Sequence, residues 1–221
     1  MFGTKEVRGV YISKQHLTCT SPNVTQPGTV PLTIKYSKDR FNSDTFTYEY
    51  FSDPVVNSVE PACGPLEGYT QLTVSGSNFK EMGFGKAKCI FNETLFMNAT
   101  VIDSTTLVCD SPPFESVNPE QWYNIAVTLD GDYVSPSSGV FNYYRQPKIS
   151  SISPWTGPLS GGTVSTVTGH GFNQTNICNF VVRFEQKHLL ATDRVDKSFQ
   201  VVSPAVNVSG AVVVSVSGNN Q

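Results

Sequence analysis

The sequence predicts an all-β protein made of β-sandwich domains in tandem. Hydrophobic residues make up 38% of the 221 residues and charged residues only 15%, with 17 glycines and 14 prolines. This composition is typical of short strands separated by turns, and not of helical bundles or disordered chains. Apolar and polar residues alternate over short stretches, as at Phe46, Tyr48 and Tyr50, which indicates half-buried strands. A stretch that occurs twice indicates repeated domains.

The repeated stretch covers residues 151–172 and recurs without a gap over residues 58–79. It begins as a short strand, continues as a turn of prolines and glycines, and ends as a strand that closes on Gly-x-x-Phe. Beyond this stretch, Phe91 and Phe184 lie at the same offset. The chain is therefore an array of similar domains.

The later copy reads Ile152-x-Pro154-x-x-Gly157-Pro158. It is followed by Gly161-Gly162-Thr163, a β-branched strand and Gly169-x-x-Phe172. These residues resemble the start of an IPT/TIG domain. The resemblance covers nearly the whole chain and implies tandem immunoglobulin-like β-sandwiches, as found in plexins, the hepatocyte growth factor receptor and Rel-type transcription factors. It implies little about function, because the family includes ectodomains, accessory domains of enzymes and DNA-binding proteins.

The length exceeds one sandwich of about 100 residues and falls short of three. We expect residues 1–53 to be the C-terminal half of an IPT/TIG domain, residues 54–145 a complete domain, and residues 146–221 a domain that lacks its last strand. Half a sandwich exposes its core, so upstream sequence or another chain would complete the first domain. The alternative is a small domain complete in itself. No apolar segment typical of a signal peptide follows Met1, so the chain would be mature or partial.

The complete domain contains seven strand signals separated by turn residues. Phe141 and Tyr143 repeat the spacing of Tyr48 and Tyr50 and are expected in the core. In the third domain, residues 211–216 are expected to match the strand at Ile125–Val127, and the aromatic final strand has no counterpart. The result would be an open edge that a neighbouring strand could join; alternatively, the sequence simply stops there. The expected strands are Val55–Val59, Gln71–Val74, Ala87–Phe91, Ala99–Ile102, Thr106–Val108, Asn124–Leu129 and Val140–Tyr144.

Cys89 and Cys109 are expected to form a disulfide. At the equivalent positions of the third domain, Val182 and Val201 replace them together, as a bonded pair predicts. The resemblance supports the pairing, because extracellular members of the family often carry this bond.

The other three cysteines are less constrained. Cys19 shares the Cys-x-Ser-Pro context of Cys109 and would pair with a cysteine upstream. Cys63 and Cys178 are expected at facing ends of consecutive domains, where they either bond to each other or remain buried thiols.

Five Asn-x-Ser/Thr motifs are candidate N-glycosylation sites. Roughly three would arise by chance in so Asn-, Ser- and Thr-rich a sequence, so the count alone proves little. Two of them fall in expected loops and two flank one turn. Together with paired cysteines, they indicate an extracellular or cell-surface protein made in a eukaryotic secretory pathway. The asparagines are Asn23, Asn92, Asn98, Asn173 and Asn207.

No catalytic, cofactor-binding or metal-binding residue can be nominated, and the chain is not expected to be an enzyme. The histidines His16, His170 and His188 have no nucleophile or ligand-spaced partner, and no nucleophile elbow, zinc-protease motif or phosphate loop occurs. The net charge of −3 and the absence of a Lys/Arg cluster argue against nucleic acid as a partner. No apolar run reaches the length of a membrane span.

These observations favour a structural or adhesive extracellular glycoprotein that assembles end to end into a surface coat or filament. Its expected partners are other copies of itself, neighbouring immunoglobulin-like domains and N-linked glycans. Residues 54–144 hold ten acids and three bases, whereas residues 145–221 hold six bases and three acids. We expect contacts at residues 1–53 and 205–221. The alternative is the ligand-binding ectodomain stalk of a cell-surface receptor; an intracellular DNA-binding or enzyme-accessory module is a distant third.

Overall fold

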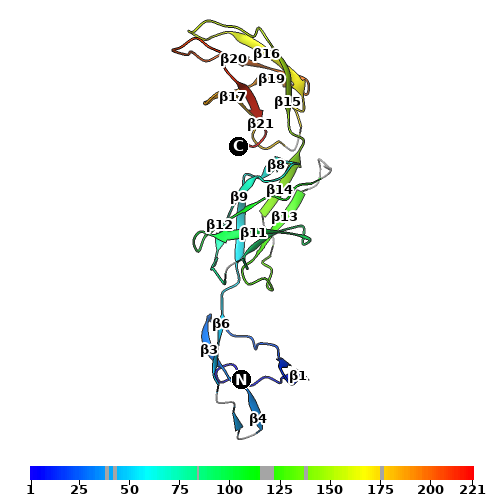
Figure 1. Cartoon of the computed structure of the whole chain (residues 1–221), viewed down its shortest axis with the longest axis vertical. Coiled ribbons are helices and arrows are strands. Elements are labelled where there is room, and N and C mark those ends of the chain that lie inside the picture. Colours follow the sequence, from blue (N-terminus) through cyan, green and yellow to red (C-terminus); the bar gives the residue numbers. More distant parts are fainter. Residues whose placement is uncertain (38–39, 42–43, 84, 115–121, 137–138, 175–176) are drawn as a thin grey trace. The chain divides into compact units, whose positions relative to one another are not determined.

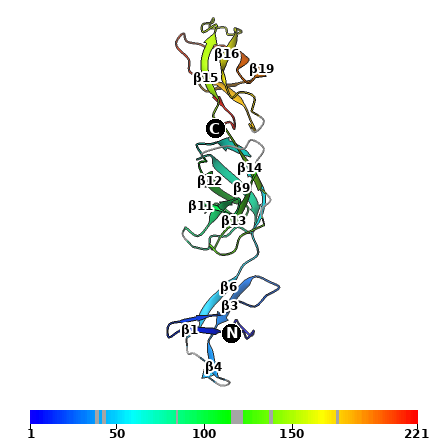
Figure 2. The same cartoon turned by 90° about the vertical axis from the view of Figure 1, so that its right-hand side faces the viewer.

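The computed structural model describes residues 1–37, 40–41, 44–83, 85–114, 122–136, 139–174 and 177–221. These residues form strands, turns and no helix, which confirms the all-β prediction (Figures 1 and 2). None of the described segments is therefore a helix long and apolar enough to cross a membrane. The chain divides into two compact units, Met1–Asp53 and Pro54–Gln221.

The first unit is built from three small two-stranded sheets, β1–β2, β3–β6 and β4–β5. In the β3–β6 sheet the strands are antiparallel, and Val30 lies opposite Tyr48. All four residues of β1 are exposed, so this hairpin adds nothing to a core. The strands are β1 (Val10–Ser13), β2 (His16–Thr18), β3 (Gly28–Leu32), β4 (Lys35–Ser37), β5 (Arg40–Phe41) and β6 (Phe46–Tyr50).

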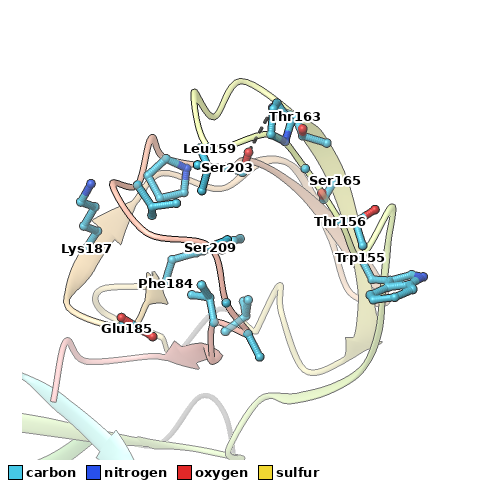
Figure 3. Close-up of a pocket in the computed structure, with 18 of the residues that line it drawn as sticks. Trp155, Thr156, Leu159, Thr163, Ser165, Phe184, Glu185, Lys187, Ser203 and Ser209 are labelled. Atoms are coloured by element: carbon cyan, nitrogen blue, oxygen red, sulfur yellow. Dashed lines mark hydrogen bonds between the residues drawn. The ribbon is translucent and has the colours of Figure 1, made fainter.

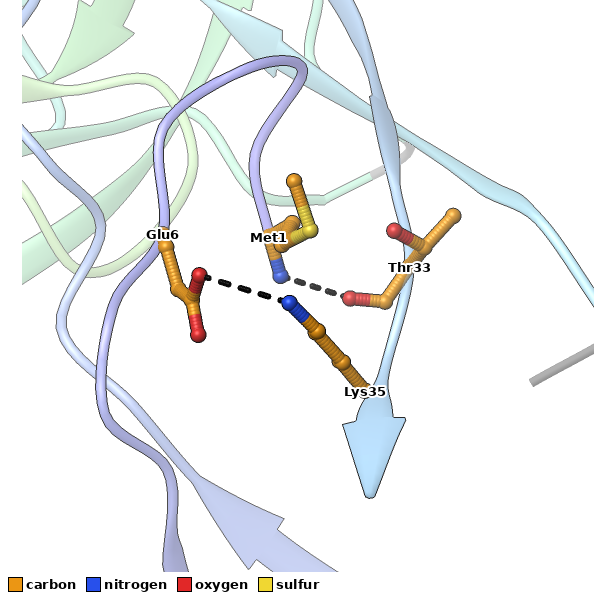
Figure 4. A network of polar contacts seen from close by, with 4 residues as sticks. All are labelled: Met1, Glu6, Thr33 and Lys35. Carbon is orange, nitrogen blue, oxygen red and sulfur yellow. Dashed lines mark hydrogen bonds and ion pairs between the residues drawn. The ribbon is translucent and has the colours of Figure 1, made fainter. Parts of the chain in front are cut away.

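The core of the first unit is a small cluster of aromatic rings. Phe2 packs edge-on against Tyr48, with ring centroids 4.9 Å apart, and lies 6.4 Å from the ring of Tyr50. Among the described residues of this unit, Phe2 is the only buried hydrophobic one. The chain start is held beside β3, where the Met1 amino group donates a hydrogen bond to the Thr33 carbonyl at 2.6 Å (Figure 4). This core is small for a unit of its length.

A β-sandwich fills the first part of the second unit. Its strands follow the order β7-β9-β12-β11-β10-β13-β14-β8 in one continuous eight-stranded sheet. The sheet folds into two layers at β11, since residues 99–101 of that strand pair with β12 and residues 95–98 pair with β10. The strands are β7 (Val55–Glu60), β8 (Cys63–Pro65), β9 (Gln71–Ser77), β10 (Lys88–Phe91), β11 (Leu95–Val101), β12 (Thr106–Asp110), β13 (Trp122–Thr128) and β14 (Gly139–Tyr144).

All seven strands predicted for this sandwich are present, and the aromatic residues of β14 lie in the core as expected. Phe141 and Tyr143 are fully buried, and the Tyr143 hydroxyl donates a hydrogen bond to the Pro112 carbonyl at 2.7 Å. The eighth strand, β8, was not predicted. It pairs in parallel with β14, a contact between segments far apart in the sequence that no local pattern of apolar residues encodes.

The two layers of this sandwich are joined by a disulfide between Cys89 of β10 and Cys109 of β12, the pair nominated from the sequence. Both cysteines are buried in the core. In the third sandwich, Val182 and Val201 occupy the equivalent places, and both are buried as well. Packing of two valines there takes the place of the covalent bond.

The third sandwich consists of two separate sheets, with strand orders β15-β16-β20-β19 and β18-β17-β21. Its core contains an aromatic cluster in which the Phe199 ring lies 4.9 Å from that of Phe172 and 5.4 Å from that of Phe180. The strands are β15 (Lys148–Ser153), β16 (Val164–His170), β17 (Val181–Phe184), β18 (Lys187–Leu189), β19 (Thr192–Val195), β20 (Ser198–Val202) and β21 (Val214–Ser217).

The strand expected at residues 211–216 is shorter than predicted, since β21 begins only at Val214. In the middle sandwich, the matching strand β13 begins at Trp122 because Trp122, Tyr123 and Asn124 pair with β14. Within residues 146–221 as described, no strand pairs with the corresponding edge of β21. Residues 211–213 therefore lack the partner that would make them a strand.

The disulfide between the layers should contribute strongly to the stability of the middle sandwich. Replacing both cysteines by the residues of the third sandwich, Cys89→Val with Cys109→Val, should lower the free energy of unfolding by about 3 kcal/mol, because the bond closes a loop of about 20 residues. Denaturant unfolding of the variant and of the wild type, both without reductant so that the Cys63–Cys178 bond stays intact, measures the effect. Equal stability of the two proteins would contradict this prediction.

Alkaline pH should destabilise the second unit through its buried tyrosines. Burial raises the pKa of Tyr144 to about 12 and raises that of Tyr143 further. A raised folded-state pKa means that the folded protein holds these protons more tightly, so the stabilisation is complete below the ordinary tyrosine pKa of 10.0 and declines as the pH rises towards 12. Tyr144→Phe should flatten this decline in denaturant titrations. Tyr69→Phe, which changes a ring that is 71% exposed, should leave it unchanged.

Candidate functional site

An open groove of about 890 Å³ lies in the third sandwich and is lined by residues of both sheets (Figure 3). One wall is the segment that follows β15, from Pro154 to Leu159, and the opposite wall is the start of β21 with the residues before it. Phe184 at the end of β17 also lines the groove. The lining is largely apolar, so the groove suits an apolar or aromatic occupant rather than an ion.

The loops beside the groove are held by hydrogen bonds that also occur at the equivalent positions of the middle sandwich. The Thr163 N–H donates to the Ser203 hydroxyl at 3.1 Å (Figure 3), as the Thr70 N–H donates to the Ser111 hydroxyl. The Val206 N–H donates to the Leu159 carbonyl at 2.8 Å. The same bond joins the equivalent pair in the middle sandwich, Phe114 and Leu66. The two loops are thus built alike in both sandwiches.

The junction between the middle and third sandwiches is covalent. Cys63 of β8 is bonded to Cys178, which lies between β16 and β17, with the two Cα atoms 5.7 Å apart. Of the two possibilities left open by the sequence, the structure has the bonded pair. Cys63 is buried, and the bond links residues separated by 115 positions in the chain.

Further contacts surround this disulfide. Gly218 lies against the ring of Tyr144, so closely that a Cβ at position 218 would come within 2.5 Å of ring atoms. The Gln221 side chain donates a hydrogen bond to the Gln71 carbonyl of β9 at 3.0 Å. The last residues of the chain are therefore in contact with the middle sandwich, and β21 is anchored at the end where it leaves the groove.

The five asparagines of the candidate glycosylation motifs lie on the surface to different degrees. Asn23, Asn98, Asn173 and Asn207 are exposed, and Asn92 is half-buried. Asn98 lies within β11 and not beside a turn as expected. The Asn173 motif extends to residue 175, which lies outside the described residues.

Asn92 differs from the others because its side chain has a structural role. Its backbone φ is 45°, a left-handed conformation in which asparagine is favoured over most residues. Its side-chain oxygen accepts a hydrogen bond from the Asn124 N–H at 2.8 Å, and its own N–H donates to the Asn124 carbonyl. The side-chain nitrogen, to which a glycan would be attached, is not used by either bond.

The histidine, cysteine and acidic side chains of the described part of the chain do not gather into a metal-binding group. No group of three or more His, Cys, Asp or Glu residues there is arranged to hold a metal ion. Cys19, expected to pair with an upstream cysteine, is free and exposed in this structure. The groove was not predicted from the sequence as a site. The sequence indicated only an open strand edge in residues 146–221.

Several solved structures resemble the fold of this chain. The full extracellular region of plexin A4 aligns with 93% of this chain at 18% sequence identity and a TM-score of 0.50, and the chain spans 18% of that protein. In a second crystal form of that region, the alignment covers 76% of this chain and 17% of the other, at 22% identity and a TM-score of 0.44. A surface glycan-binding protein from Prevotella bryantii aligns with 76% of this chain and 40% of its own, at 16% identity and a TM-score of 0.30.

The sequence also matches a family model along most of its length. The model of the IPT/TIG domain matches residues 1–50, 54–143 and 147–221. This agrees with the repeated Pro-x-x-Gly-Pro turns and with the layered sheets of the second unit. The chain belongs to the IPT/TIG domain family.

Proposed function

We propose that this chain is part of an extracellular structural protein whose immunoglobulin-like domains assemble end to end into a coat or filament. The observation that carries the proposal is an open apolar groove in the third sandwich, beside an edge of β21 with which no strand of the described residues pairs. Unpaired strand edges readily accept a strand from a neighbouring molecule. A contact between two different surfaces of identical chains that does not close into a ring produces a filament.

An extracellular location is supported by the two disulfides of the second unit. Such bonds persist in oxidising compartments and are rare in the cytosol. Four of the five asparagines in glycosylation motifs are exposed, which a secreted glycoprotein requires. Membership in a family of immunoglobulin-like domains fits a binding or structural role better than a catalytic one.

The charge distribution supports association between copies. Residues 54–144 hold ten acids and three bases, and residues 145–221 hold six bases and three acids. Opposite charges on two surfaces orient the encounter between molecules, while burial of apolar groups supplies most of the affinity. The apolar groove is one part of the described surface that is suited to that burial.

The second candidate is the stalk of a cell-surface receptor. The disulfide between Cys63 and Cys178 favours it, because a covalent link between consecutive sandwiches suits a spacer. A stalk has no need of association between identical chains. Self-association is therefore the property that separates the two functions.

Several of the asparagines should carry N-glycans in protein from secreting eukaryotic cells. Asn98→Gln should reduce the mass by one glycan without loss of stability, because Asn98 is exposed on β11. Intact-mass measurement before and after digestion with a glycan-cleaving amidase gives the answer. Protein whose mass is unchanged by the amidase would remove the glycoprotein proposal.

Two variants distinguish the glycan on Asn92 from the structural role of its side chain. Asn92→Gln and Thr94→Ala both destroy the motif and should remove the same glycan mass. Only Asn92→Gln also removes the bond to Asn124, so it alone should lower the free energy of unfolding, by about 1 kcal/mol. Equal stability of the two variants made without glycans would show that this hydrogen bond does not matter.

The full chain should self-associate as its concentration rises. Light scattering should show a continuous increase in mean mass rather than a stop at a dimer, because an end-to-end contact leaves a free surface at each end. Added salt should slow the association by screening the charges. A folded monomer at every concentration, with both units protected from proteolysis, would contradict end-to-end assembly and favour the receptor-stalk function.

A further inference from the structure

Strand β11 carries an exposed aromatic ring and a candidate glycosylation site on the same face. Successive residues of a strand point to opposite faces of its sheet. The half-buried residues of this strand pack against the core of the middle sandwich, and they are Met97, Ala99 and Val101. Phe96, Asn98 and Thr100 alternate with them and are exposed. These three residues therefore share the outer face of the sheet.

The ring of Phe96 is the exposed end of an apolar row on that outer face. Phe96 lies opposite Ile90 of β10, and Ile90 lies opposite Ala126 of β13. Ile90 is on the outer face because its neighbours in the chain, Cys89 and Phe91, belong to the core. Ile90 and Ala126 are buried, whereas the Phe96 side chain is 54% exposed. Phe96 is therefore the member of the row that solvent reaches.

A sugar attached to Asn98 would lie within reach of this ring. Phe96 and Asn98 are two positions apart on one face of a strand, which corresponds to roughly 7 Å between their Cα atoms. The first sugar of an N-glycan is N-acetylglucosamine, and one face of its ring carries mainly C–H groups. Such a face packs on aromatic rings, because its weakly positive hydrogens meet the negative face of the π system. No change of the backbone is needed for this contact.

The position of the aromatic residue distinguishes this motif from the other four. In Phe96-x-Asn98-x-Thr100 an aromatic residue stands two positions before the asparagine. The residues at that position in the other motifs are not aromatic, and they are Ser21, Ile90, Gly171 and Ala205. Across the sheet, Asn98 lies opposite Lys88, so a sugar that leaned that way would meet an amine instead of an apolar surface. The apolar contact for the sugar is on the Phe96 side.

We propose that Phe96 is the platform on which the first sugar of an N-glycan at Asn98 packs. This inference rests on the glycoprotein part of the proposed function and adds the residue that positions the glycan. The contact covers the exposed ring and holds the glycan over the outer face of β10 and β11. Because the contact lies at the surface, it orients the sugar and adds little to the free energy of unfolding. Contacts between copies would then use surfaces other than this face.

Nuclear magnetic resonance of the full chain tests the contact directly. The protein is secreted from eukaryotic cells with ¹³C-labelled sugars and trimmed by an endoglycosidase to one N-acetylglucosamine at each site. The signals of the sugar on Asn98 are identified by their loss in Asn98→Gln. They should lie upfield of the signals of the sugars on Asn23 and Asn207, because the ring current of an aromatic side chain shields protons above its face. Nuclear Overhauser effects should join this sugar to the ring protons of Phe96.

Three variants separate the ring from its surroundings. Phe96→Leu keeps an apolar side chain without the ring, so the signals should return to the position seen at the other sites. Phe96→Tyr keeps a ring and should retain the upfield shift. Lys88→Gln changes the residue opposite Asn98 and should leave the shift unchanged. An upfield shift that persists in Phe96→Leu, or that is lost in Lys88→Gln, would overturn the role of Phe96. Circular dichroism verifies that each variant folds.

The packed sugar should also be released more slowly. A glycan-cleaving amidase acting on the folded protein should remove the glycan from Asn98 roughly threefold faster in Phe96→Leu than in the wild type, as expected on loss of a contact as strong as an exposed aromatic pair. Release from Asn23 should proceed at the same rate in both proteins, which makes it an internal control. Equal rates of release from Asn98 would contradict the proposed packing.

The outcomes separate this inference from the proposed function. A glycan on Asn98 without the upfield shift and without the nuclear Overhauser effects would overturn the platform and leave the glycoprotein proposal standing. Glycans on other asparagines with Asn98 unoccupied would do the same. The absence of every glycan would overturn both. A monomeric chain that shows the contact would overturn end-to-end assembly and leave the platform standing.

Discussion

The structure of the middle sandwich depends on one aromatic strand that pairs with another strand along each of its edges. In the middle sandwich, β14 pairs with β13 on one edge and with β8 on the other, and it places two buried rings in the core. Each such ring contributes roughly 2–3 kcal/mol through burial. The third sandwich has no counterpart among its described strands, and two further elements are lost with it. Residues 156–158 and 211–213 are not strands, because a strand forms only beside a partner.

The third sandwich remains ordered around its groove for two reasons. Its own core keeps the Phe172, Phe180 and Phe199 cluster and the two valines that replace the disulfide. In addition, a disulfide bonds its Cys178 to Cys63 of the middle sandwich. The groove is consequently a preformed surface whose loops already have the hydrogen bonds of the complete domain. Because the site is already ordered, binding of a ligand costs little conformational entropy, which favours binding.

The first unit presents the opposite situation. It has an aromatic strand, β6, but only one buried hydrophobic residue among those described. The rings of Tyr48 and Tyr50 are 4.9 Å apart and share Phe2 as a neighbour, without a second layer such as the one that covers β14. The described core of the first unit is thus much smaller than the cores of the two sandwiches of the second unit.

The sequence by itself determined the all-β class, the repeated domains, the seven strands of the middle sandwich and the pairing of Cys89 with Cys109. Each of these depends on local periodicity or on comparison of one repeat with another, and both are visible in the order of the residues. Tertiary structure decided the presence of β8, the late start of β21 at Val214, the bond between Cys63 and Cys178, and the shape of the groove. These features depend on which distant segments lie side by side, and a strand edge or a pair of sulfur atoms acquires its partner only when the layers pack.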